Sequence, residues 1–158
     1  MNGSPNFFLD NFYTFCRVML LVPSKIQSWQ VEEAALVIFF LILASGVIIL
    51  CDRLMKRYDL GFATNILVAV GVLCLAVGLT GFMMSVPRLL VSASRPFRVV
   101  GIGAPVINFA LAAITSMGNR LSKQHSIAGA LILGGAGILF GWVLVTTFLL
   151  FYLGLYNY

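Results

Sequence analysis

The sequence predicts an all-α, polytopic membrane protein with four transmembrane helices and an N-terminal interfacial amphipathic helix, all within one domain, residues 1–158. Three observations predict this class. Only 9% of the residues are charged, whereas a soluble domain has about 25%. Hydrophobic residues make up 61% of the chain and gather in long uncharged runs, and about 18 apolar residues suffice to cross a bilayer. The runs are continuous rather than alternating, which excludes a membrane β-barrel.

The first segment, at about 6–22, has the pattern of an amphipathic helix. Pro23 is expected to end it. Its short length and its charges favour an interfacial position over a crossing, with Trp29 as a candidate interface anchor. The alternative is a helix that docks on a partner protein. Its apolar residues recur at helical spacing: Phe8, Phe12, Phe15 and Met19.

The first two crossings are predicted at about 34–51 and 62–86, with Gly61 in the turn between them. The first is bulky and branched throughout, so we expect it on the outside of the bundle. The second carries small residues at intervals of 3, 4, 3 and 4, which places them along one helix face. These residues are Gly71, Cys74, Gly78, Gly81 and Ser85.

A loop at 87–98 precedes the third crossing, predicted at about 99–117. Glycine, proline and polar residues dilute this segment, so a re-entrant or interfacial segment is the alternative. The fourth crossing, at about 127–155, is longer than a hydrocarbon layer of roughly 30 Å requires. Tyrosines follow at its end, as expected at a headgroup layer: Tyr152, Tyr156 and Tyr158.

Small residues also line one face of each of the last two crossings. Such faces let helix backbones approach closely, which favours helix association in lipid. The partner is either a helix of the same chain or a helix of another chain. A further alternative is that these faces line a pathway. The third crossing has Gly101, Ala104, Asn108, Ala112 and Thr115; the fourth has Ser126, Ala130, Gly134, Gly137 and Gly141.

The chain shows no pattern of catalytic residues, so we expect neither an enzyme nor a cofactor. No ionisable residue lies in the middle of any predicted crossing, and intramembrane chemistry usually needs one. Asn108 is the main polar candidate, either as a hydrogen-bonding contact between helices or as a contact to a ligand or ion. The single histidine, His125, and three scattered cysteines predict no metal site.

Basic residues cluster in the loop before the third crossing, at Arg88, Arg95 and Arg98. They flank the membrane as topological charges, or they bind a lipid headgroup or phosphate. For four crossings, Lys and Arg divide five against five between the two sides, so orientation stays open; without the third crossing the division is seven against three. A net charge of +5 with little soluble surface gives no case for nucleic acid binding.

The sequence therefore predicts a multi-pass integral membrane protein that acts as a non-catalytic subunit of a larger complex. Its expected partners are the lipid bilayer and either other membrane subunits or copies of itself. One alternative is a homo-oligomeric channel. A further alternative is a small carrier or a protein that binds anionic lipid.

Overall fold

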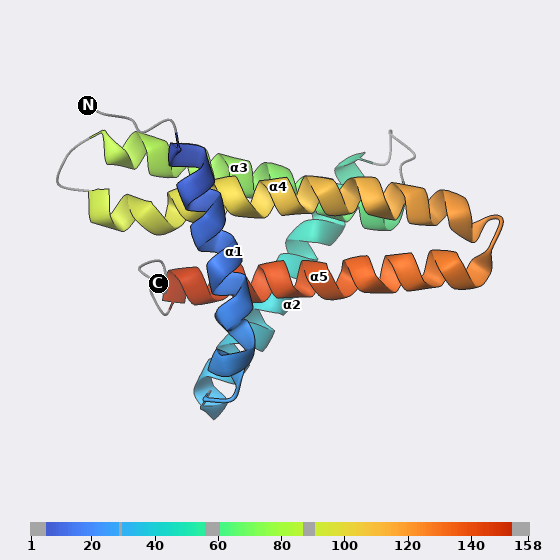
Figure 1. Ribbon diagram of the computed structural model, residues 1–158, viewed down its shortest axis with the longest axis horizontal. Coiled ribbons are helices and arrows are strands. Elements are labelled where there is room, and N and C mark those ends of the chain that lie inside the picture. The colour runs from blue at the N-terminus through green and yellow to red at the C-terminus, as the bar shows by residue number, and fades with distance from the viewer. Residues whose placement is uncertain (1–5, 29, 56–60, 87–90, 153–158) are drawn as a thin grey trace.

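The computed structural model describes residues 6–28, 30–55, 61–86 and 91–152, and all regular structure in these ranges is helical. α3, α4 and α5 lie side by side, whereas α1 crosses α4 and α5 transversely and α2 runs obliquely to them (Figure 1). The helices are α1 (Phe7–Ile26), α2 (Val31–Met55), α3 (Phe62–Ser85), α4 (Val91–Ser122) and α5 (Ser126–Tyr152).

Within the described ranges, three helices contain stretches long and apolar enough to cross a membrane: Phe62–Met84, Ser94–Ser122 and Ser126–Phe151. These stretches indicate an integral membrane protein and confirm the all-helical class. In α2, the apolar stretch found among the described residues is Ala34–Leu43. The fourth crossing and the interfacial role of the first segment therefore stay predictions.

α4 differs most from its predicted bounds. The helix is 32 residues long and starts at Val91 rather than near residue 99, so most of the predicted loop is helical. Pro96 and Pro105 lie inside it. Prolines are tolerated in transmembrane helices because surrounding helices satisfy the freed backbone groups, and α4 packs against α1, α3 and α5. Residues 87–90, including Arg88, lie outside the described part of the chain.

α1 also runs further than predicted, through Pro23 to Ile26. Proline has no N–H, so Pro23 leaves the carbonyl of Met19 without its helical donor. The indole Nε1–H of Trp142 on α5 donates to this carbonyl at 2.7 Å. The orphaned acceptor is thus satisfied from another helix, and α1 continues for most of a further turn.

The main core forms where α1 packs on α4 and α5. Phe15, Val18 and Val22 of α1 are fully buried, and the ring of Phe15 occupies the space that a side chain at Gly103 would need. This buried set differs from the predicted apolar face, because Phe8 is 65% exposed. The partners on α4 and α5 include Val99, Val100, Ala104, Val143, Leu149 and Leu150.

The remaining boundaries agree with the sequence to within a few residues. Gly61 precedes α3 with a φ of 85°, a left-handed conformation that glycine adopts without strain. α3 and α5 begin at Phe62 and Ser126. Trp29, Tyr156 and Tyr158 lie outside the described residues, as do residues 153–155 of the fourth predicted crossing.

Candidate functional site

The small-residue faces of α3 and α4 meet each other. A Cβ added to Gly78 would lie 2.7 Å from the Cα of Gly101, so the two backbones are in direct contact. Two further α3 glycines lie against aromatic residues of α4, Gly71 against Phe109 and Gly81 against Phe97. Cys74, between them, is partly buried. The side chain of Ser85 lies outside the described part.

The polar residues of the α4 face are buried in the same interface. Thr115 lies 3.3 Å from Thr64 of α3, oxygen to oxygen, and also donates to backbone carbonyls of its own helix. Asn108 is fully buried, and neither its Oδ1 nor its Nδ2 has a hydrogen-bond partner among the described residues. Asn108 lies seven residues from both Gly101 and Thr115, and therefore on the face that meets α3. The expected hydrogen bond from Asn108 to a neighbouring helix is not formed with any residue that the structure describes.

Nothing in the described part of the chain packs on the predicted stripe of α5. Ala130, Gly134 and Gly137 are exposed, and a Cβ added at Gly134, Gly137 or Gly141 would have no atom within 4 Å. α5 instead turns another face to α4, on which Gly129 meets Ser122 and Ala136 packs with Leu111 and Ala112. We call the open stripe of Ala130, Gly134, Gly137 and Gly141 the α5 glycine face.

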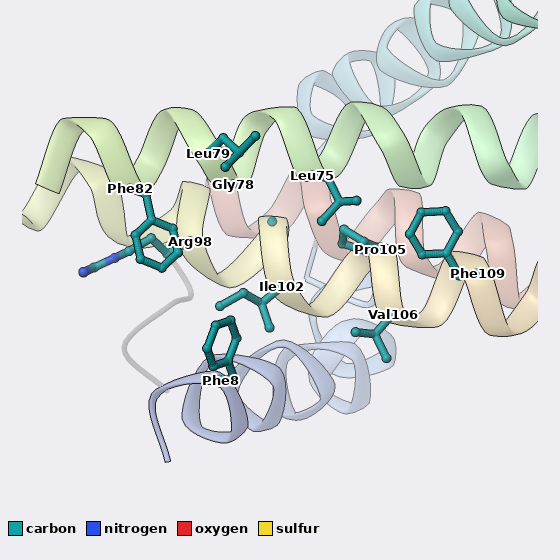
Figure 2. Close-up of a pocket in the computed structure, with 11 residues that line it drawn as sticks. Phe8, Leu75, Gly78, Leu79, Phe82, Arg98, Ile102, Pro105, Val106 and Phe109 are labelled. Atoms are coloured by element: carbon teal, nitrogen blue, oxygen red, sulfur yellow. The ribbon is translucent and has the colours of Figure 1, made fainter. Parts of the chain in front are cut away.

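A long groove runs along the outside of the α3–α4 pair and has a volume of about 500 Å³. Gly78 and Gly101 lie in its lining, and Phe8 of α1 borders it (Figure 2). We call it the α3–α4 groove. Its side walls are apolar and come from Leu75, Leu79 and Phe82 of α3 and from Ile102, Pro105, Val106 and Phe109 of α4.

One charged residue lines the groove, Arg98, which lies at the end opposite Phe109 (Figure 2). Its Nε is buried and has no hydrogen-bond partner in the described ranges of the chain. Its guanidinium carbon lies 5.8 Å from the ring centroid of Phe7, a cation–π contact. Phe7 in turn packs edge-on against Phe82, with 5.5 Å between the ring centroids. The start of α1 thus holds this end of the groove in place.

The three arginines of the predicted basic cluster are not equivalent in the structure. Arg98 is half-buried in the groove, Arg95 is exposed and does not line it, and Arg88 lies outside the described residues. A second, more polar hollow of about 620 Å³ lies at the other end of the bundle, between the start of α3 and the end of α4. Its two cations, Arg120 and Lys123, are both exposed.

The described residues contain no group of histidine, cysteine and carboxylate side chains that could hold a metal ion. Cys16 and Cys74 are free thiols. Burial raises the pKa of the Cys16 thiol, which lowers its thiolate fraction and its reactivity at neutral pH. His125 is exposed in the turn before α5.

The geometry therefore offers two surfaces to other molecules, the α5 glycine face and the α3–α4 groove. Comparisons of the chain with protein-family models, with curated proteins and with solved structures found no match.

Proposed function

We propose that this chain is a non-catalytic integral membrane subunit that joins a larger membrane assembly through the α5 glycine face. The proposal depends on one observation, the open space at Gly134, Gly137 and Gly141. Within the same chain, Gly78 and Gly101 bring two helix backbones into contact. The α5 glycine face is a second stripe of small residues, and it is exposed. It therefore supports the same close backbone contact with a helix of another chain.

The arrangement of the other helices supports a membrane setting for this contact. If α3, α4 and α5 cross the bilayer, α1 lies across them, as an interfacial helix would (Figure 1). In this proposal α2 is the fourth crossing. It packs mainly on α3 and exposes large apolar side chains such as Phe39 and Ile42, as expected for a helix on the outside.

The alternative of a homo-oligomeric channel has less support. A path lined by Asn108 needs this side chain at a surface that copies of the chain share. Asn108 is instead fully buried between the helices of one chain.

The experiment compares two glycine variants of the full-length chain. Gly137→Leu blocks the α5 glycine face, whereas Gly135→Leu places the same side chain at an equally open position about 160° around the helix. Overpacking of a close interface costs about 1–3 kcal/mol, so Gly137→Leu should weaken assembly roughly tenfold. Size-exclusion chromatography with light scattering in mild detergent measures the assembled fraction.

Wild type and Gly135→Leu should both run as species larger than the 17.2 kDa chain with its detergent. Pull-down between differently tagged copies then separates self-association from a different partner. A wild-type protein that runs as a single chain would refute the proposal, and so would equal disruption by both variants.

A further inference from the structure

We infer that the α3–α4 groove is a binding site for an anionic phospholipid, with one acyl chain along the groove and the headgroup phosphate on Arg98. The inference goes beyond the proposed assembly role and is independent of it, because no residue of α5 lines the groove. Four observations support it.

The first is the charge of the site. Arg98 is the one cation among the lining residues, and its Nε is buried without a hydrogen-bond acceptor. An arginine at membrane depth is costly unless it is paired. The guanidinium group offers several donors in a planar fork that matches phosphate oxygens. An anion at this position would supply the acceptor that the described part of the chain does not.

The second is depth. The backbone nitrogen of Arg98 lies 3.0 Å from the Cβ position of Gly81, and Gly81 is three residues before the end of the apolar stretch Phe62–Met84. Arg98 therefore lies within about one turn of the end of the α3 crossing. Lipid headgroups lie at this level, and a long arginine side chain reaches toward it.

The third is length and direction. The groove follows α4 from Arg98 to Phe109 (Figure 2), which is about 16 Å at 1.5 Å per residue. This is about half of a hydrocarbon layer of roughly 30 Å, the depth that the acyl chains of one leaflet fill. A lipid with its phosphate at Arg98 would thus lie parallel to its neighbours in the bilayer.

The fourth is the shape and lining of the groove. The Gly78–Gly101 contact lies at its floor, where the absence of side chains makes room, and large apolar residues form its walls. Its volume of about 500 Å³ is in the range of small-molecule sites. Apart from Arg98, no lining residue carries a charge, so the groove has no acceptor or donor pattern for a polar peptide.

The test is a titration of the full-length protein in mild detergent with dioleoyl phosphatidylglycerol, followed by native mass spectrometry. Dioleoyl phosphatidylcholine serves as the lipid control. Arg98→Gln keeps a polar side chain but removes the charge, and it should weaken binding of phosphatidylglycerol about tenfold. The same substitution should leave the weaker binding of phosphatidylcholine nearly unchanged.

Two further variants separate the groove from general surface charge. Arg95→Gln removes the same charge at the same end of the bundle but outside the groove, and it should bind phosphatidylglycerol like wild type. Val106→Trp fills the groove and should abolish tight binding of both lipids. Both variants are first checked for cooperative thermal unfolding like that of wild type in the same detergent, so that loss of binding is not loss of fold.

Three results would overturn the inference. Equal weakening by Arg95→Gln would show a diffuse basic surface. Unchanged phosphatidylglycerol binding in Arg98→Gln would show that the arginine does not hold the phosphate. Loss of assembly in Val106→Trp with lipid binding retained would assign the groove to a partner helix. The Gly137→Leu experiment tests the assembly proposal separately, because it measures the mass of the complex and not lipid binding.

Discussion

Asn108 lies near the middle of α4 with its side chain fully buried, and neither atom of its amide has a hydrogen-bond partner in the part of the chain that the structure describes. A buried polar group without a hydrogen bond costs about 1–3 kcal/mol. Asn108→Val, an apolar replacement close in size, should therefore raise the stability of the folded protein by an amount of this order. The midpoint of thermal unfolding in mild detergent measures the change.

Thr115→Val is the matched control on the same face of α4. Its hydroxyl lies 3.3 Å from that of Thr64 and donates to the helix backbone, so its removal should lower stability by about 0.6 kcal/mol, a typical value for such contacts in membrane proteins. If Asn108→Val is destabilising instead, the amide is bonded in the folded protein, and Asn108 would become a functional candidate again.

At the scale of single helices, the contact between Trp142 and Met19 decides how α1 ends. Trp142→Phe removes the indole N–H and leaves the Met19 carbonyl without a donor, because Pro23 cannot supply one. We expect the end of α1 to loosen from α5, at a cost of about 1–3 kcal/mol for the unsatisfied acceptor. Alkylation of Cys16, on the same helix, by a maleimide at constant pH should then become faster.

The direction of this effect follows from the pKa of Cys16. Burial raises that pKa and so lowers the thiolate fraction. Release of α1 would return the pKa toward its ordinary value and increase the reactive thiolate at any pH below the raised pKa. Tyr13→Phe, an exposed change on α1, should leave the rate unchanged. Equal rates in wild type and Trp142→Phe would contradict this role of the indole.

The bounds of a helix could be predicted from the sequence where they coincide with the ends of a long uncharged run. α3 and α5 begin at Phe62 and Ser126, as the uncharged runs indicate. α1 and α4 extend past their predicted bounds because tertiary contacts override proline: Trp142 satisfies the carbonyl that Pro23 frees, and three helices surround α4. The sequence around Pro23 cannot indicate this hydrogen bond, because its donor lies 123 residues away from the Met19 carbonyl.

For the whole molecule, the small residues predicted close helix approach but not which faces meet. The α3 and α4 stripes could be identified, and they pack together at Gly78 and Gly101. On α5 two small-residue faces compete, and the chain uses the one with Gly129 and Ala136. Among the basic residues, only the fold separates Arg98 from Arg95, because the groove forms from two helices and the start of α1.

The number of crossings is the remaining property of the whole molecule, and the helix order makes it testable. Ser28 lies in the exposed connection before α2, and Lys123 lies in the exposed turn between α4 and α5. Three helices separate them: α2, α3 and α4. If all three cross the membrane, the two positions lie on opposite sides; if α2 does not cross, they lie on the same side.

We expect opposite sides, since α2 has 25 residues, about 37 Å of helix, which exceeds a hydrocarbon layer of roughly 30 Å. Ser28→Cys and Lys123→Cys in sealed membrane vesicles should react with an impermeant maleimide from different sides, one before and one only after permeabilisation. Labelling of the unmodified chain, with its own three cysteines, is the background to subtract. Labelling of both variants from one side would place α2 at the membrane surface beside α1 and leave a three-crossing bundle of α3, α4 and α5.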